Sequence, residues 1–242
     1  MKNKNKDIVL LITGCISPDS FVPVLALKDP VERRRQYIKS IKYYIQNTFF
    51  KNIVYCDNSG AVADEELKFL ADKYQKNFEW LSFVGDSKKC IDCGKGYGEG
   101  EIVNYALEHS SIMSQCSFMI KITGRLKVTN LELLLRFAAM DKVQFLPNKT
   151  MDRRHYINTR IYMMPIEVYR QCFKDAYLLV DDEKGVFMEH AFGICSDKNA
   201  IKYKKFIVCP RIVGGSGSTG RVYQTDLAEH IKNTLKMYLY RR

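Results

Sequence analysis

Two cations flank a short turn near the middle of the chain, at the end of an apolar segment. The segment reads FMIKITGRLKV over residues 118–128, with Lys121 inside the apolar run and Arg125 directly after Gly124. Side chains alternate along a strand, so Lys121 and Thr123 share one face. A buried charge needs an anionic partner, because leaving it unpaired is costly. That partner is either a protein carboxylate or a bound anion, and a diphosphate would account for both cations and for the glycine.

Turn-forming residues follow two other apolar segments. ITGCISPD places Thr13 and Gly14 at the end of the first run, and YCDNSG places Asp57 at the end of the next. Open α/β sheets bind ligands at the carboxyl ends of their strands. We therefore expect Thr13 and Gly14 near a ligand, and the Asp57 carboxylate to accept from a base or a ribose hydroxyl. Simple turns explain the same residues, and the GxGxxG dinucleotide fingerprint is missing.

The glycine-rich segment CIDCGKGYGEGE, residues 90–101, admits three interpretations. Its CxxC would need two further ligands to hold zinc, but no second CxxC exists and His109 lies inside the next predicted helix, so we expect no metal site. Alternatively, a glycine-rich loop carries Lys95 over a phosphate at a helix N-terminus, although the Walker A pattern is missing. The third interpretation is a surface loop in which Glu99 and Glu101 cap the next helix.

Two later segments add candidate side chains. DDEKGVFMEHAF contains Glu189 and His190, either of which could take a proton from an acceptor hydroxyl. The alternative is that Glu189 caps or pairs on a helix and His190 faces solvent. PRIVGGSGSTGRVYQTD combines four glycines with hydroxyl residues and an arginine, which is typical of a backbone nest for phosphate. Its candidate phosphate ligands are Ser216, Gly217, Ser218, Thr219 and Arg221.

The composition predicts a globular protein with anionic partners. The chain has 242 residues, 46% of them hydrophobic, and a formal net charge of +11. Such a charge attracts nucleic acid, anionic lipid or an anionic small substrate, and does not choose among them. The 8 cysteines are irregularly spaced and follow no signal-peptide pattern, so we expect reduced thiols in the cytoplasm. No apolar segment reaches the ~20 residues of a membrane-spanning helix.

Strand-like and helix-like segments alternate along the first 150 residues and must position these side chains. Apolar runs predict strands at 8–16, 52–58, 78–84, 117–124 and 142–148. Helical spacing between them, as in DPVERRRQYIKSIKYYIQNT, predicts one α/β domain with a mostly parallel sheet and helices on both faces. Later, HYINTRIYMM and KKFIVCPRIV each predict a strand, and PIEVYRQCFKDAYLLV predicts a helix.

The last segment, 226–242, predicts a basic amphipathic helix. Apolar residues recur every four positions at Leu227, Ile231, Leu235 and Leu239. Basic residues lie outside this stripe at Lys232, Lys236, Arg241 and Arg242. Such a helix either binds an anionic membrane surface or packs on the sheet or on another subunit.

The order of these motifs resembles bacterial capsule, lipooligosaccharide and O-antigen glycosyltransferases with a GT-A-like, Rossmann-like fold. The motifs are LLITGCI, NIVYCDNSG, GKGYGEGEIVNYAL, FMIKITGRLKV, MEHAF and RIVGGSGSTGRVY. In GT-A enzymes the strand that here ends in KITGR usually leads to a DxD motif, which holds a divalent ion against the donor diphosphate. This chain has Lys121, Thr123 and Arg125 there. The departure implies that side-chain cations replace the metal, so neither a bound metal nor another cofactor is expected.

The resemblance implies that residues 1–225 form a nucleotide-sugar-binding and catalytic domain. Such a domain transfers a sugar from a nucleoside-diphosphate donor to a saccharide acceptor, here expected to be lipid-linked, in surface polysaccharide synthesis. The first turn and Asp57 would hold the nucleoside. Lys95, Lys121, Arg125 and the GGSGSTGR segment would surround the diphosphate. Glu189 corresponds by position to the base of inverting enzymes, although a retaining mechanism stays open.

Two other functions are weighed against this interpretation. A sugar-phosphate nucleotidyltransferase would need Mg²⁺, and the missing carboxylate pair counts against it. A basic nucleic-acid-binding module would carry an RNP-like, helix-turn-helix or zinc-finger pattern, and the sequence has none, so no nucleic-acid partner is expected. The expected localisation is the cytoplasm, with peripheral association at the inner face of the cell membrane.

Overall fold

A computed structural model of the chain describes residues 7–23, 25–146, 156–215, 220, 222–224 and 227–239. The first half contains β1 (Ile8–Gly14), α1 (Pro30–Asn47), β2 (Asn52–Asp57), α2 (Glu65–Lys73), β3 (Asn77–Ser82), α3 (Ser87–Cys93), α4 (Lys95–His109), η1 (Met113–Gln115), β4 (Phe118–Thr123), β5 (Leu126–Val128) and α5 (Leu131–Arg136). The second half contains β6 (Gln144–Leu146), β7 (Asn158–Pro165), α6 (Ile166–Cys172), η2 (Ala176–Leu179), α7 (Met188–Lys198), β8 (Lys204–Lys205), β9 (Ile212–Gly215), β10 (Val222–Gln224) and α8 (Leu227–Leu239).

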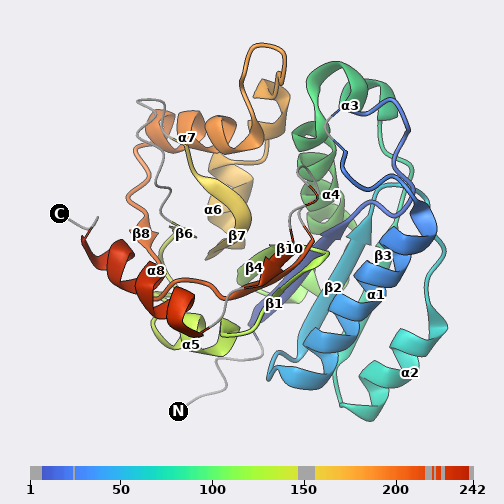
Figure 1. Ribbon diagram of the computed structural model, residues 1–242, viewed down its shortest axis with the longest axis horizontal. Helices are drawn as coiled ribbons and strands as arrows, with labels where there is room; N and C mark the ends of the chain where they lie inside the picture. The colour runs from blue at the N-terminus through green and yellow to red at the C-terminus, as the bar shows by residue number, and fades with distance from the viewer. Residues whose placement is uncertain are drawn as a thin grey trace.

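The central sheet is mainly parallel, with strand order β3-β2-β1-β4-β7-β6-β8. Strands β3, β2, β1 and β4 run in the same direction, and β7 runs against both of its neighbours. A smaller antiparallel sheet has the order β10-β9-β5. Helices cover the central sheet, with α1 and α2 on one side and α4, α6 and α7 nearer the other (Figure 1). The expected α/β architecture is confirmed.

Both faces of β1, β2 and β4 are buried, which explains why these strands read as continuous apolar runs. In β1, Leu10 and Ile12 face the cluster that includes residues of α1, whereas Val9 and Leu11 face the cluster that includes residues of α4. The side chain of Asp29 caps α1 by accepting from the amide of Val31, and Pro30 occupies the first turn as predicted. This packing holds the carboxyl ends of the strands at one edge.

Two segments depart from the predicted secondary structure. The stretch 204–213, predicted as one strand, divides into β8 and β9, which belong to different sheets. Pro210 lies between them, and proline cannot donate to a sheet ladder. The stretch 165–180, predicted as one helix, divides into α6 and the short 3₁₀ helix η2.

The glycine-rich segment 90–101 is helical and not the loop that two of the interpretations expected, although Lys95 does stand at the start of a helix. It contains the end of α3 and the start of α4, separated by Gly94 at φ +111°. A side chain at Gly100 would overlap Tyr177 of η2, and one at Gly98 would lie 2.8 Å from Sγ of Cys90. Close packing therefore explains these glycines, and it outweighs the poor helix propensity of glycine.

The C-terminal helix α8 is present, although the bounds of the prediction exceed the described residues. Arg241 and Arg242 lie outside them. Ile231 and Leu235 are 51% and 60% exposed, so the middle of the predicted apolar stripe is uncovered. Among the helices of the described ranges, none combines the length and apolar character needed to cross a membrane.

Candidate active site

A cavity of about 640 Å³ opens at the carboxyl ends of β1, β2 and β4, and residues of α4 and β10 contribute to its wall. Several elements contribute to its wall, as expected for a ligand site of an open α/β sheet. The polar and glycine residues of the wall include Thr13, Gly14, Arg33, Asn58, Ser59, Lys95, Gly98, Glu99, Thr123, Arg125, Tyr156, Thr159, Arg160, Glu189, Gly215 and Tyr223.

Thr13 and Gly14 line this cavity, as predicted from their place at the end of β1. A side chain at Gly14 would overlap the ring of Tyr55, so a larger residue does not fit there. Gly124 donates its amide to the carbonyl of Thr13 at 2.8 Å, and a side chain at Gly124 would overlap that carbonyl. The two glycines thus bring the ends of β1 and β4 together beneath the cavity.

Asp57 does not line the cavity, which corrects the expectation that it contacts a nucleoside. Its side chain is fully buried. One carboxylate oxygen accepts from the amide of Ile16 at 2.8 Å and the hydroxyl of Tyr55 at 3.1 Å. The other accepts from the amide and the hydroxyl of Ser59 at 2.8 and 2.6 Å. Four donors occupy its acceptor sites, so Asp57 fastens the loops after β1 and β2.

One end of the cavity is cationic and contains Arg125. Its side chain is 7% exposed, its Nη1 donates to Oε1 of Gln36 at 3.4 Å, and its guanidinium lies 6.0 Å from the centre of the Tyr37 ring. Burial lowers the pKa of Arg125, an effect that Tyr37 opposes and Arg33 reinforces. Within the described part of the chain, Arg125 forms no ion pair with a carboxylate. A bound anion would supply the missing negative charge.

Arg33 is a second buried cation at this end, which the sequence analysis did not identify. Its Nε donates to the carbonyl of Cys15 at 2.8 Å, and its Nη1 donates to the carbonyl of Leu27 at 2.9 Å. The signal was present, because Arg33 lies four residues before Tyr37 and eight before Ile41 on the buried face of α1. A cation on the apolar stripe of a helix indicates a buried polar role.

Two carboxylates, Glu99 and Glu189, also line the cavity, and Lys121 lies beneath it. This fully buried lysine forms an ion pair with Glu99 of α4 and donates to the carbonyl of Thr159 at 2.9 Å. Its Nζ also lies 3.3 Å from the hydroxyl oxygen of Thr123. The partner of Lys121 is therefore a protein carboxylate, and the argument from an unmatched lysine to a diphosphate fails at this residue. Thr123 and Glu99 both line the cavity.

Glu189 lies in the first turn of α7 and faces the cavity beside this pair. Burial raises the pKa of its carboxyl, the nearby Glu99 raises it further, and Lys121 and a hydrogen bond from Thr159 oppose the rise. Lys95 stands at the start of α4 close to the same carboxylates. Burial lowers the pKa of Lys95, while Asp182, Glu189 and Glu99 act in the opposite direction.

His190 has a structural position, against the expectation that it is catalytic. It is 8% exposed and does not line the cavity. Its Nδ1 accepts from the amide of Phe187 at 3.2 Å, which caps the start of α7. The ring of Tyr156 packs edge-on against it at 5.1 Å. Both the catalytic and the solvent-facing interpretations of His190 are replaced by this capping contact.

The predicted phosphate nest falls outside the described part of the chain. Ser216, Gly217, Ser218, Thr219 and Arg221 lie outside the described residues. The residues on either side, Gly215 and Tyr223, line the cavity.

The end of β4 itself carries no carboxylate pair for a divalent ion, although Glu99 of α4 lies 3.3 Å from the hydroxyl oxygen of Thr123. Thr123 and Arg125 offer a hydroxyl and a cation where a divalent ion prefers carboxylate oxygens. No cluster of three or more His, Cys, Asp or Glu side chains suited to a metal occurs in the described ranges.

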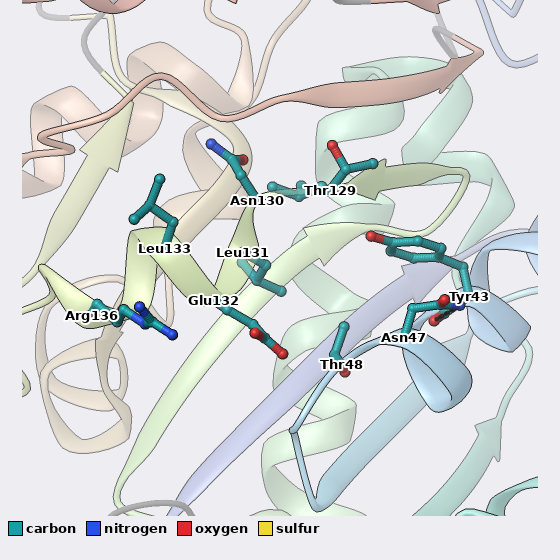
Figure 2. A pocket seen from close by; sticks show the side chains of 10 residues that line it. Tyr43, Asn47, Thr48, Thr129, Asn130, Leu131, Glu132, Leu133 and Arg136 are labelled. Atoms are coloured by element: carbon teal, nitrogen blue, oxygen red, sulfur yellow. Dashed lines mark hydrogen bonds between the residues drawn. The ribbon is translucent and has the colours of Figure 1, made fainter. Parts of the chain in front are cut away.

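A second hollow, of about 320 Å³, lies away from this cavity (Figure 2). It is formed between the C-terminal end of α1, which carries Tyr43 and Asn47, and α5, which carries Glu132 and Arg136. Glu132 accepts from the amide of Phe49 at 3.1 Å, so it fastens the chain after α1. The large cavity is the better candidate, because it combines buried cations with carboxylates at the carboxyl ends of the strands.

No protein family and no curated protein matches the sequence. Solved structures do match. The glycosyltransferase GlyE of Streptococcus pneumoniae TIGR4 has a TM-score of 0.53 at 8% identity, over 84% of this chain and 45% of that chain. A nucleotide-diphospho-sugar transferase candidate of Desulfovibrio desulfuricans G20 has a TM-score of 0.49 at 7% identity, over 84% of this chain and 80% of that chain. A cytidylyltransferase of Leptospira borgpetersenii has a TM-score of 0.44 at 8% identity, over 96% of this chain and 87% of that chain. The likeness is one of fold, and the fold of this chain is GT-A-like.

Proposed function

We propose that this protein is a glycosyltransferase that moves a sugar from a nucleoside-diphosphate donor to a saccharide acceptor. The observation that carries the proposal is that one cavity is lined both by Arg125, a buried cation with no ion pair to a described carboxylate, and by Glu189, a carboxylate whose pKa is raised by burial. A transferase of this kind needs both a cation for the leaving diphosphate and a base for the acceptor.

The donor would lie along the ends of β1 and β2, with its diphosphate at Arg125. Thr13, Gly14 and Ser59 border that part of the cavity with small polar groups. Arg125 is buried and forms no ion pair with a described carboxylate, so its charge is available to phosphate oxygens. Charge-assisted hydrogen bonds from arginine to phosphate are short and strong. Lys121 has no part in this contact, because Glu99 already matches its charge.

Glu189 would remove the proton of the acceptor hydroxyl. The hydroxyl oxygen then forms a bond to the anomeric carbon of the donor, and the bond from that carbon to the diphosphate oxygen breaks. The electron pair leaves with the nucleoside diphosphate, whose added negative charge Arg125 stabilises. The raised pKa of Glu189 suits a base that must hold the proton it receives. A single displacement of this kind inverts the anomeric configuration.

A ligand screen with the full chain tests the donor proposal. Thermal unfolding is measured with UDP, GDP, CDP or dTDP, each in EDTA and in Mn²⁺. A nucleoside diphosphate at about 100 times its Kd stabilises a protein by about 2.7 kcal/mol, which corresponds to about 5 to 11 °C here. One of the four is expected to give such a shift in EDTA. Arg136→Ala, in the second hollow, serves as a control and should show the same shift.

Two results would change the proposal. If none of the diphosphates stabilised the protein, the donor site would be wrong. If Mn²⁺ tightened binding by about 100-fold, or 2.7 kcal/mol, the replacement of a metal by side-chain cations would be wrong. Product analysis separates the reaction classes, because a glycosyltransferase releases a nucleoside diphosphate and a nucleotidyltransferase releases pyrophosphate.

The acceptor is proposed to be carried on a lipid, with α8 holding the enzyme at an anionic membrane surface for surface polysaccharide synthesis. The exposed side chains of Ile231 and Leu235 are one turn apart on α8, and Lys232 and Lys236 follow each of them directly. An apolar stripe beside lysines matches the chemistry of an anionic bilayer surface.

Sedimentation with phosphatidylglycerol vesicles tests this attachment. The wild-type chain is expected to sediment at low salt and to be released at high salt, because surface attraction is screened. Ile231→Asn/Leu235→Asn should abolish sedimentation without lowering Tm, since both side chains are exposed. Val62→Asn, at a residue that is 79% exposed on another surface, should sediment like the wild type. Equal sedimentation of all three proteins, or of none, would remove the membrane proposal.

A further inference from the structure

Arg160 of β7 is a third cation of the cavity that has only neutral partners. Its Nε donates to Oδ1 of Asn158 at 3.1 Å, and its Nη1 donates to the hydroxyl of Tyr223 at 2.8 Å. The guanidinium lies 5.3 Å from the centre of the Tyr223 ring. Across the described ranges, no carboxylate forms an ion pair with it. The side chain is therefore held in one position, and no carboxylate of the described residues matches its charge.

The pairing of β7 with β6 is irregular beside this side chain. Phe145 pairs with Tyr162, but the next residue of β6, Leu146, pairs with Asn158, so residues 159–161 have no partner on β6. Side chains of a regular strand alternate between faces, yet Thr159 and Arg160 both line the cavity. A shift in register of this kind re-aims a side chain, and such shifts are common next to active sites.

The position of Arg160 is on the acceptor side of the proposed reaction. Tyr156, which also lines the cavity, interacts with both Glu189 and Arg160: Glu189 acts to raise its pKa and Arg160 acts to lower it. Arg160 thus lies in the same cavity as the candidate base, next to Thr159, whose carbonyl accepts from Lys121. Arg125 instead contacts Gln36 and Tyr37.

We propose that Arg160, held by Asn158 and Tyr223, binds an anionic group of the acceptor, namely the carboxylate of an acidic sugar or a phosphate on a sugar. This inference rests on the proposed function and narrows its acceptor class. A purely structural residue here would need only hydrogen bonds to an amide oxygen and a hydroxyl, which glutamine could also make. A guanidinium adds a fixed charge and a planar pair of donors, which match a carboxylate or a phosphate. Tyr223 would present its ring to the sugar.

Calorimetric titration of the full chain with three matched probes tests this assignment. The probes are methyl glucuronide, methyl glucoside and glucose 6-phosphate. At C6 they carry a carboxylate, a hydroxymethyl group and a phosphate ester, respectively, and only the first two carry a methyl group on the anomeric oxygen. The wild-type protein is expected to bind an acidic probe at least about 10-fold more tightly than the glucoside. The stronger of the two acidic probes identifies the anion as carboxylate or phosphate.

Three variants assign the preference to Arg160. Arg160→Gln should bind acidic and neutral probes equally, whereas Arg160→Lys should retain part of the preference. Arg125→Gln, which removes the cation at the donor end, should keep it. Equal binding of all probes by the wild type, or no binding of an acidic probe at millimolar concentration, would overturn the inference. A preference that survived Arg160→Gln would overturn it as well.

The test distinguishes this inference from the proposed function. Nucleoside diphosphate binding is measured on the same proteins, and Arg160→Gln should leave it unchanged. If a diphosphate binds but the acidic preference is absent, the donor site stands and the acceptor class is wrong. If the acidic preference is present but no diphosphate binds, the anion site stands and the proposed function is wrong.

Discussion

Removing the charge of Lys121 is expected to destabilise the fold strongly, although the residue lies under a candidate active site. Lys121 is fully buried, and the side chain of Glu99, its ion-pair partner, is 25% exposed. Lys121→Met retains the length of the side chain but leaves the Glu99 carboxylate without its cation. It also removes the donor to the carbonyl of Thr159. Breaking a buried ion pair on one side costs about 3 to 5 kcal/mol.

The lower end of that range applies, because Glu99 keeps some contact with water. A loss of about 3 kcal/mol lowers Tm by about 6 to 12 °C in a protein of this size. Adding Glu99→Gln to Lys121→Met removes the stranded charge, so the double variant should be more stable than the single one. The coupling between the two sites should be about 1 to 3 kcal/mol.

Urea unfolding, followed by far-ultraviolet circular dichroism and by the fluorescence of Trp80, measures these differences. Lys174 and Glu108 provide the control, because their Nζ to Oε1 distance is 3.0 Å and both side chains are about half exposed. Lys174→Met should change Tm little, since exposed pairs add little to stability. A Lys121→Met protein as stable as the wild type, or a double variant no more stable than the single one, would refute the reasoning.

Three further predictions concern the cavity and its supporting helix. Arg125→Ala should weaken the binding of a nucleoside diphosphate by about 1.5 to 3 kcal/mol in calorimetry and leave the binding of the bare nucleoside unchanged. Equal losses for both ligands would show that Arg125 does not act on the phosphates. Glu189→Gln should lower kcat by about 100-fold or more with unchanged donor affinity. Because burial raises the pKa of Glu189, the folded wild type loses stability as pH rises through that pKa. Glu189→Gln should therefore have the higher Tm at pH ~8 and no such advantage at pH ~4. A pH series of thermal melts checks this difference. Gly100→Ala should cost about 1 to 3 kcal/mol through overlap with Tyr177, while Gly215→Ala, whose new methyl meets only Gln36 at 3.5 Å, should be close to neutral in urea unfolding.

Much of the sheet was predictable because β1, β2 and β4 are buried on both faces. Continuous apolar runs located β1, β2, β3 and β4, and the spacing of apolar residues located α1. Alternation of these elements then indicated a parallel sheet. Glycine propensity misled the prediction at 90–101, because contacts of Gly98 and Gly100 with distant parts of the chain decide the structure there. Such contacts are not visible in a local pattern.

The candidate site was predictable in place but less so in its pairings. Thr13, Gly14, Thr123 and Arg125 line the cavity, because the carboxyl ends of parallel strands meet at one edge. The partner of Lys121 is 22 residues earlier in the chain, in the first turns of α4, which were predicted as a loop, and the sequence offered no means of joining the two.

Similarly, the place of Asp57 at a strand end was predicted correctly, but its role was not. A carboxylate at that position can face the ligand or turn back toward the backbone. Here it turns back, because four nearby groups donate hydrogen bonds to it. Arg160 was missed because its partner Tyr223 is 63 residues later in the chain, and no local pattern joins the two.

The four hydrogen bonds of Asp57 have a consequence for the dynamics of the cavity rim. Two of their donors are the backbone amides of Ile16 and Ser59, which belong to the two loops that border the donor end. Hydrogen exchange at these amides requires the loops to detach from a buried carboxylate, so both amides should be protected like strand residues although they lie in loops. A rim that is already ordered in the free protein loses little conformational entropy when a ligand arrives. The loops after β1 and β2 are therefore a fixed frame against which differently shaped ligands can be distinguished.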